Sequence, residues 1–228
     1  MDTYTIEPIA VIRTDFPEKF GIPRQSGRVP SLEGRIVFGP AYRTPEALRG
    51  IEGFSHLWLI FGFSENHGWS PTVRPPRLGG NKRVGVFASR SPFRPNGLGL
   101  SSVRLLRVEQ TEQDGTVLVV GGADLLDGTP IYDVKPYLST ADLHPDAVGS
   151  YADAANGYRL TVDFPEALLE LLPPDKRQAA IDCLADDPRP SYQDDPERIY
   201  GMLFAGSDIR FRVADGTLTV TDVIRKNG

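Results

Sequence analysis

The chain has 228 residues, a formal net charge of −5, 23 glycines, 20 prolines and one cysteine. This length allows one large domain or a medium and a small one, and the composition is that of a globular protein. The lone Cys183 excludes an intrachain disulfide and a cysteine-based zinc cage, and no apolar run approaches the roughly 20 residues of a membrane span. The first residues show no secretory pattern. We therefore expect a cytoplasmic protein without a metal or a membrane partner.

Strand patterns dominate the first 140 residues, and the high proline content favours short strands and structured loops. The run Gly53–Phe63 is continuously apolar and predicts a strand buried on both faces. Thr44–Leu48 starts like a helix, with Thr44 as a candidate N-cap. The predicted strands are Thr5–Ile12, Gly34–Phe38, Gly53–Phe63, Arg83–Ala88, Ser101–Val108, Thr116–Asp124 and Thr129–Tyr132, the last two joined by a tight Asp127-Gly128 turn. Loops rather than helices separate them, which predicts an antiparallel barrel or sandwich.

Helical spacing first becomes convincing after a change in composition near residue 163. The expected helices are Pro165–Leu172 and Asp175–Ala185, and the expected strands are Ile199–Ala205, Asp208–Val213 and Thr217–Val223, the last two joined by Asp215-Gly216. The fold class is therefore mainly β. We expect a small antiparallel β-barrel domain over residues 1–163 and a small α+β domain over residues 164–228.

The segment Val117–Gly128 (VLVVGGADLLDG) imitates a strand followed by a glycine-rich nucleotide loop. A Rossmann fingerprint requires that this loop open a helix within a βαβ unit. Pro130 and Pro136 follow at once and deny that helix. The sequence therefore predicts a barrel that is not of the Rossmann type.

A basic stretch stands out in this acidic chain. Between Asn66 and Val108 there is no Asp or Glu, and eight basic residues occur: Arg74, Arg77, Lys82, Arg83, Arg90, Arg94, Arg104 and Arg107. Such a run is often only a solvated face. Here the arginines sit among Pro, Gly and Phe, which favours contacts with an anionic partner such as a nucleic acid.

Gly85–Ser101 (GVFASRSPFRPNGLGLS) packs two arginines, two prolines and several glycines into one loop. The prolines make the loop rigid and the glycines permit unusual backbone angles. Such a loop can aim Arg90 and Arg94 at an anion and offer Phe93 for stacking. The alternative is a stiff connection whose arginines are merely solvated.

This segment is similar to the signature GVFATRSPFRPNPIGLS of the YaeB/TrmO/VirR family of tRNA methyltransferases. GFSHLWLIFGF, WSPTVRPPRLGG, LLDGTPIYDVKPY and DPRPSY resemble other segments of that family in the same order, as does the N-terminal IAVIRTDFPEKFGIPRQSG. The resemblance covers most of residues 5–140 and a piece of the tail. One departure is Gly97-Leu98, where the family more often has Pro-Ile.

The resemblance implies an enzyme that uses S-adenosyl-L-methionine to methylate N6 of N6-threonylcarbamoyladenosine, next to the anticodon of a threonine tRNA. It also implies a small antiparallel β-barrel and a homodimer with the cofactor close to the dimer interface. The core of strands predicted from the residues alone agrees with this fold.

Site residues follow from the matched segments and from the chemistry of the ligands. For the cofactor we expect Pro23, Arg24, Gln25, Glu65, Asn66, Arg90, Arg94, Leu100, Asp127, Gly128, Thr129 and Pro130. For handling the substrate base we expect Asp133, Lys135 and Tyr137, with Asp133 as proton acceptor; for tRNA contact we expect Arg189 and Tyr192. Glu65 and Asn66 could instead be rim residues, and the Asp133 group a structural ion pair beside a packed tyrosine. His56 and His67 are alternative proton acceptors.

Two other functions remain open. One is a methyltransferase of the same fold that acts on another RNA or on a small metabolite, although the basic stretch argues against a metabolite. The other is a non-catalytic barrel that binds RNA or a protein partner, against which the intact PRQ, RSPFRPN and DGTP segments argue. The tail is acidic, so we expect it to touch tRNA only through DPRPSY, and a chain ending near Asp163 to keep the cofactor.

Overall fold

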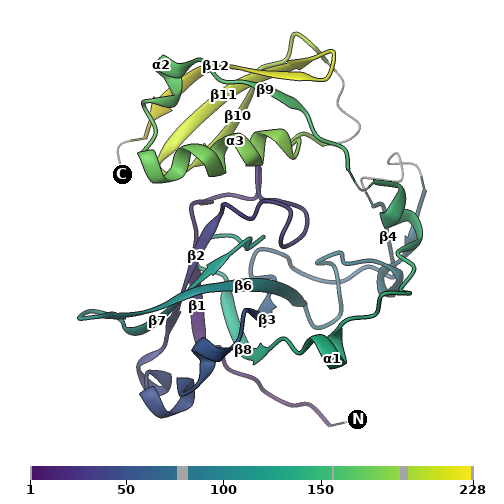
Figure 1. Ribbon diagram of the computed structural model, residues 1–228. Coiled ribbons are helices and arrows are strands. Elements are labelled where there is room, and N and C mark those ends of the chain that lie inside the picture. Colours follow the sequence, from purple (N-terminus) through teal and green to yellow (C-terminus); the bar gives the residue numbers. More distant parts are fainter. Residues whose placement is uncertain (1, 76–81, 156, 191–194, 227–228) are drawn as a thin grey trace.

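The computed structural model describes residues 2–75, 82–155, 157–190 and 195–226. Six antiparallel strands close into a barrel in the lower part of Figure 1. In their order around the barrel these strands are β1 (Ala10–Arg13), β2 (Glu33–Phe38), β7 (Gly115–Gly121), β6 (Leu98–Thr111), β3 (His56–Gly62) and β8 (Pro130–Pro136). The prediction of a mainly β chain built on an antiparallel barrel is confirmed.

Apolar side chains that point inward from every second position of the strands fill the interior of the barrel. Ile12, Ile36 and Leu118 point inward and are fully buried. On β3, Leu57 and Leu59 are fully buried, whereas the intervening Trp58 is only half-buried. Burial of β3 on both faces was therefore a wrong prediction, because successive residues of a barrel strand face the interior and the outside in turn. The outer face of β3 is only partly covered within this chain: the Trp58 ring packs against Tyr137, and its indole N–H donates to Asp142 at 3.0 Å.

The Asp127-Gly128 turn does not join two paired strands. β7 pairs with β2 and β6, whereas β8 pairs with β1 and β3, so residues 122–129 cross between strands that are not neighbours in the barrel. The N–H of Gly128 donates to the carbonyl of Ile12 at 2.8 Å, and the turn is thereby fixed against β1. The predicted local connection is replaced by a crossover.

Shorter elements lie in the connections between the barrel strands and after β8. They are the strands β4 (Thr72–Val73) and β5 (Val84–Gly85), the helix α1 (Ser139–Asp142), and 3-10 turns at Pro40–Tyr42, Pro45–Leu48, Ile51–Gly53, Val86–Ala88 and Ser150–Ala155. The strand expected at 83–88 is thus only two residues long, since the chain turns into a 3-10 helix before the arginine-bearing loop. Over the ranges that the structure describes, no helix is long and apolar enough to cross a membrane.

The C-terminal part is a four-stranded sheet with helices on one face. Its strand order is β10 (Tyr200–Phe204), β11 (Ser207–Ala214), β12 (Thr217–Arg225) and β9 (Thr161–Asp163), the last pairing in parallel with β12. The helices are α2 (Glu166–Leu169) and α3 (Arg177–Ala185), with a 3-10 turn at Pro174–Lys176. In Figure 1, α3 lies between this sheet and the barrel. Both helices are shorter than expected: α2 begins one residue later and ends three residues earlier, and the first two residues expected in the second helix belong to the 3-10 turn instead.

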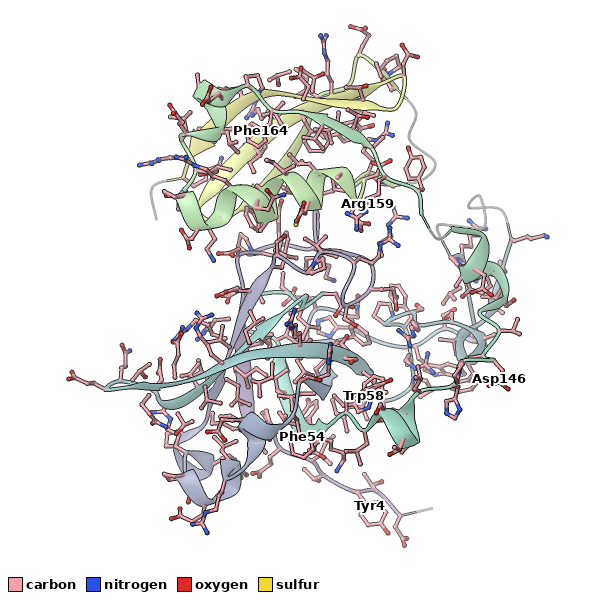
Figure 2. The ribbon with its side chains drawn as sticks, viewed as in Figure 1. Tyr4, Phe54, Trp58, Asp146, Arg159 and Phe164 are labelled. Carbon is pink, nitrogen blue, oxygen red and sulfur yellow. The ribbon has the colours of Figure 1, made fainter. Side chains whose placement is uncertain are left out.

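The hydrophobic core of the C-terminal part includes residues from the start of the chain. Phe16, Val29 and Leu32, which lie between β1 and β2, pack with Met202, Phe204 and Phe211. Arg159 lies between the barrel and the C-terminal sheet in Figure 2 and donates to the carbonyl of Arg28. β9 also places residues 161–163 in the C-terminal sheet, ahead of the expected boundary at 163/164. The division into two domains stays a prediction. Side chains from residues 16–32 belong to the hydrophobic core of the C-terminal part.

Candidate active site

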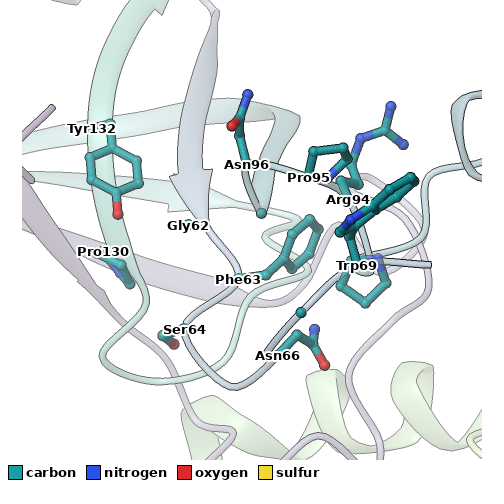
Figure 3. A pocket seen from close by; sticks show the side chains of 13 residues that line it. Gly62, Phe63, Ser64, Asn66, Trp69, Arg94, Pro95, Asn96, Pro130 and Tyr132 are labelled. Carbon is teal, nitrogen blue, oxygen red and sulfur yellow. The ribbon is translucent and has the colours of Figure 1, made fainter. Parts of the chain in front are cut away.

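A pocket of about 340 Å³ lies where β3 ends and β8 begins (Figure 3). Its lining residues are Gly62, Phe63, Ser64, Asn66, Gly68, Trp69, Pro92, Arg94, Pro95, Asn96, Gly97, Pro130 and Tyr132. Asn66, Arg94 and Pro130, which belong to three separate segments expected to bind the cofactor, therefore meet at one cavity. Trp69 is 57% exposed beside them. The pocket combines amide, guanidinium and aromatic groups, as a ligand site for a nucleoside requires.

The loop after the 3-10 turn Val86–Ala88 is held in shape by Arg94. Its guanidinium donates to the carbonyl of Val86 at 3.1 Å and to that of Ser89 at 2.7 Å, and it lies 5.8 Å from the centre of the Phe87 ring. Arg94 is thus largely engaged within its own loop. Gly97 has φ +59°, which proline cannot adopt, so the backbone here depends on the residue that departs from the family signature.

Arg90, in contrast, reaches a different segment of the chain. It is exposed, and its Nη1 donates to Oε1 of Gln25 at 2.5 Å. Gln25 belongs to the loop between β1 and β2, which we call the cofactor loop (residues 20–32). The structure thereby brings together two of the segments that were expected to bind one ligand.

Other expected cofactor residues, in the cofactor loop and in the segment Glu65–Asn66, already make contacts within the chain. Nη2 of Arg24 donates to the main-chain carbonyl of Arg189 at 2.6 Å, and Pro23 is buried. Lys19 donates to the carbonyl of Glu65 and to Oδ1 of Asn66, both at 3.2 Å. Arg24 therefore links the cofactor loop to the C-terminal part, and its guanidinium is only partly free for a ligand.

The segment 127–130 is fixed from β1. Oδ1 of Asp127 accepts the N–H of Thr14 at 3.0 Å, and Oδ2 lies 3.5 Å from a guanidinium nitrogen of Arg13. Thr129 is buried, and its hydroxyl donates to the carbonyl of Leu126 at 2.7 Å. The Asp127 side chain stabilises the turn, and Pro130 is the residue of this segment that lines the pocket.

Leu100 lies on the outer face of β6. It pairs in register with Ile60 of β3 and is 51% exposed. It is not among the residues that line the pocket. Within one chain it belongs to the partly exposed apolar face that also includes Ile60 and Trp58.

Asp133, Lys135 and Tyr137 gather at the opposite end of β8 from Pro130. Oδ2 of Asp133 lies 2.9 Å from Nζ of Lys135 in an exposed ion pair. The Tyr137 ring packs 5.5 Å from that of Trp58. Asp133 lines a second, more apolar pocket of about 360 Å³ together with residues such as Phe54 and Pro136. In one chain, therefore, these three residues do not reach the pocket that holds Asn66 and Arg94.

Arg189 is buried, with 8% of its surface exposed. Its guanidinium binds both carboxylate oxygens of Asp187, at 2.9 and 3.0 Å, and this partner raises the pKa of Arg189. A stacking contact with RNA would require Arg189 to leave this pair. Tyr192 lies outside the described residues.

One carboxylate next to these segments was not expected from the sequence. Asp124, three residues after the end of β7, accepts a hydrogen bond from the Ser101 hydroxyl at 2.7 Å. Burial raises the pKa of Asp124. The available signal was an acid shortly after the six buried residues of β7, in the segment that we had set aside as an imitation of a nucleotide loop. Trp69, Asn96 and Tyr132 were missed as well.

Within the described ranges, no group of three or more His, Cys, Asp or Glu side chains could hold a metal ion. The chain is similar to known proteins along nearly all of its length. The tRNA (adenine(37)-N6)-methyltransferase of Escherichia coli is 44% identical over 96% of this chain and 97% of its own. A putative S-adenosylmethionine-dependent methyltransferase, RcsF, of Pseudomonas aeruginosa is 40% identical over 92% of both chains.

A solved structure agrees with these relatives. The crystal structure of TrmO from Pseudomonas aeruginosa superposes with a TM-score of 0.82 at 34% identity, covering 99% of this chain and 98% of that one. The family model of the tRNA-methyltransferase O N-terminal domain matches residues 11–143, and that of the TrmO C-terminal domain matches residues 158–226. The chain therefore belongs to the TrmO family and is a methyltransferase.

Proposed function

We propose that the chain methylates N6 of adenosine 37 in tRNA with S-adenosyl-L-methionine, and that the adenosine is N6-threonylcarbamoyladenosine in a threonine tRNA. The names of the relatives support N6 of adenosine 37 as the methylated position and S-adenosyl-L-methionine as the cofactor. The observation that carries the proposal is the pocket at which Asn66, Arg94 and Pro130 meet, together with the contact to Gln25 that Arg90 makes from the same loop as Arg94.

The residues present fit the proposed cofactor. Its carboxylate suits the exposed guanidinium of Arg90, since arginine forms strong charge-assisted hydrogen bonds with carboxylates. Its ribose and adenine suit the amides of Asn66 and Asn96 and the rings of Trp69 and Tyr132, which line a cavity of about 340 Å³. When bound, the cofactor supplies an electrophilic methyl group; the chain's own task is to hold the acceptor nitrogen in line with it.

The surroundings of the pocket also suit a single-stranded RNA. Trp69, Phe87 and Phe93 are exposed, and the last two belong to the same arginine-bearing segment. Bases of an anticodon loop can be splayed out and stacked on such rings while arginines contact the phosphates. A tRNA substrate agrees with the cytoplasmic location that we expect.

We further propose that a second copy of the chain covers the outer face of β3 and β6. Trp58, Ile60 and Leu100 lie on that face; the first two were expected to be buried, and Leu100 was expected to touch the cofactor. In this arrangement Asp133 would accept the substrate proton at the partner's pocket, beside Lys135 and Tyr137. This accounts for its distance from the pocket of its own chain.

Mass analysis of tRNA after incubation with labelled cofactor tests the activity. Methylated adenosine 37 supports the proposal, and Arg90→Ala should weaken cofactor binding by roughly 1.5–3 kcal/mol, the scale of a charge-assisted hydrogen bond. Label on another RNA or on a metabolite supports the second hypothesis. RNA binding without any transfer of label supports a non-catalytic barrel, and wild-type affinity of the Arg90→Ala protein removes Arg90 from the site.

Mixing two variants tests the action across the interface. Asp133→Asn and Arg90→Ala should each be nearly inactive alone. A mixed dimer contains one intact site if Asp133 acts on the partner's pocket, so an equal mixture should regain about a quarter of wild-type activity. A mixture that regains nothing contradicts the exchange, and a fully active monomer in light scattering contradicts the dimer.

A further inference from the structure

The carboxylate of Asp142, the last residue of α1, is bonded to the barrel and to its own loop at the same time. Its Oδ2 accepts the indole N–H of Trp58, on the outer face of β3, at 3.0 Å. The same oxygen accepts the main-chain N–H of Leu138 at 2.8 Å. Both lengths are those of ordinary N–H···O hydrogen bonds. Trp58 lies beside the helix that carries Asp142 in Figure 2, and one oxygen joins two segments that are 84 residues apart.

The helix α1 is too short to hold this loop by itself. It spans only Ser139–Asp142, and the carbonyl of Leu138 accepts the N–H groups of Ala141 at 2.9 Å and of Asp142 at 2.7 Å. A single helical turn is not stable alone, because ordering its backbone costs more than its few hydrogen bonds contribute. The bond from Trp58 supplies a tertiary contact to this turn, and it thereby fixes the peptide that follows Tyr137.

Tyr137 packs against the same indole that Asp142 holds. Its ring centre lies 5.5 Å from that of Trp58, at an interplanar angle of 42°, and 6.2 Å from that of His56. Its main-chain N–H donates to the carbonyl of His56 at 3.0 Å. Aromatic rings at such distances stabilise each other in definite orientations. The Tyr137 ring is therefore oriented by His56 and by Trp58, and Asp142 fixes the second of these.

We propose that Asp142 is a positioning residue for methyl transfer: through Trp58 and its own loop it fixes the Tyr137 ring in the orientation that receives the substrate base. The inference rests on the proposed function, in which Tyr137 helps to handle that base. Asp142 need not touch the base, because it acts through the indole and the main chain. Trp58 also pairs in register with Lys135, so an indole that turns away would disturb a second residue of the same group.

The two hydrogen bonds require an acceptor oxygen rather than a negative charge. Asp142→Asn keeps a side-chain oxygen for both donors, whereas Asp142→Ala removes it. Methyl transfer depends on in-line alignment, and a small misplacement lowers the rate steeply. We expect kcat for tRNA methylation to fall about ten- to hundredfold in Asp142→Ala and to be largely restored in Asp142→Asn. Affinity for S-adenosyl-L-methionine should stay at the wild-type value in both variants, because Asp142 is not among the residues that line the pocket of Asn66 and Arg94.

Steady-state methylation of tRNA by the full chain is the test, with calorimetry for the cofactor and light scattering for the dimer. Asp153→Ala is the matched control and should retain the wild-type kcat. The Asp153 carboxylate likewise accepts a main-chain N–H from four residues earlier, that of Gly149 at 2.7 Å, so the control removes a comparable bond and leaves the acceptor of Trp58 in place.

Trp58→Phe tests the same contact from the other side. It removes the indole N–H and keeps an aromatic ring beside Tyr137, so it should lower kcat as well, and it tests the proposal if Asp142→Ala does not fold. Because Asp142 acts through Trp58, adding Asp142→Ala to Trp58→Phe should lower kcat by a smaller factor than Asp142→Ala does in the wild type.

The outcomes separate this inference from the proposed function. Wild-type kcat in Asp142→Ala, or an equal loss in Asp142→Asn, overturns the positioning role while leaving the proposed function intact. So does an undiminished effect of Asp142→Ala in the Trp58→Phe background, or a loss of activity that comes with dissociation of the dimer. Wild type that transfers no methyl group to tRNA overturns the proposed function and this inference with it.

Discussion

Replacing Asp186 with alanine would remove one half of an ion pair that joins the cofactor loop to α3. Oδ1 of Asp186 lies 2.7 Å from Nε and 2.5 Å from Nη2 of Arg28. The two side chains are only 16% (Arg28) and 5% (Asp186) exposed, so the arginine left behind would be a buried charge without its partner. We expect the free energy of unfolding to fall by about 3 kcal/mol. For a chain of this length that corresponds to a melting temperature lower by roughly 6–12 °C.

Urea unfolding of the full chain measures this loss, and Asp208→Ala is the matched control. Asp208 pairs with Arg210 at 3.5 Å and with Lys226 at 3.7 Å, and both of these bases are about half exposed. The control should therefore lose less than about 1 kcal/mol. Adding Arg28→Leu to Asp186→Ala should restore part of the stability, because an apolar side chain needs no counter-charge. An Asp186→Ala loss no larger than that of the control would refute the reasoning.

Three further outcomes are expected. A chain ending near Asp163 should lose the cofactor as well as tRNA methylation, contrary to the expectation from sequence, because Val29 of the cofactor loop belongs to the C-terminal core; wild-type cofactor affinity in calorimetry would contradict this. Gly99→Ala should cost about 1–3 kcal/mol in urea unfolding, since its Cβ would lie 2.2 Å from Phe61, and an unchanged midpoint would contradict it. Cys183 should react with a thiol reagent only in denaturant at pH 8, because burial first and the nearby carboxylates next raise its pKa; rapid labelling of the folded chain would contradict this.

Two Asp-Gly pairs show how far local sequence predicts the fold. At Asp215-Gly216 both residues have positive φ, 49° and 74°, as a two-residue hairpin turn requires, and β11 and β12 pair as predicted. At Asp127-Gly128 only the glycine has positive φ, 77°, and the Asp127 side chain accepts from Thr14, which follows the neighbouring strand β1. The same dipeptide therefore occurs in a hairpin turn at one place and in a crossover at the other. The local sequence does not distinguish the two cases, because the crossover depends on Thr14, which is 113 residues away from Asp127.

In the candidate site, too, features that depend on local sequence were predictable, whereas contacts between distant segments were not. The rigid loop after Phe87 was predictable, because its prolines and glycines act locally. The role of Arg189 was not, since an arginine between two prolines resembles an exposed contact, whereas its guanidinium is paired with Asp187 and its carbonyl accepts from Arg24, 165 residues away. The Arg28–Asp186 pair spans 158 residues and leaves no local pattern. Its existence depends on the packing of α3 against the cofactor loop.

The basic stretch illustrates why a charge count overstates a binding surface. Arg107 binds Glu33, at 3.1 Å, and Glu109, at 2.7 Å, and these acids raise its pKa further. Both acids lie outside the acid-free stretch, so the sequence window could not reveal that this charge is neutralised. Arg94 is engaged by carbonyls of its own loop. Arg90, although bonded to Gln25, is exposed on the same loop, so attraction for RNA should arise around this loop rather than along β6.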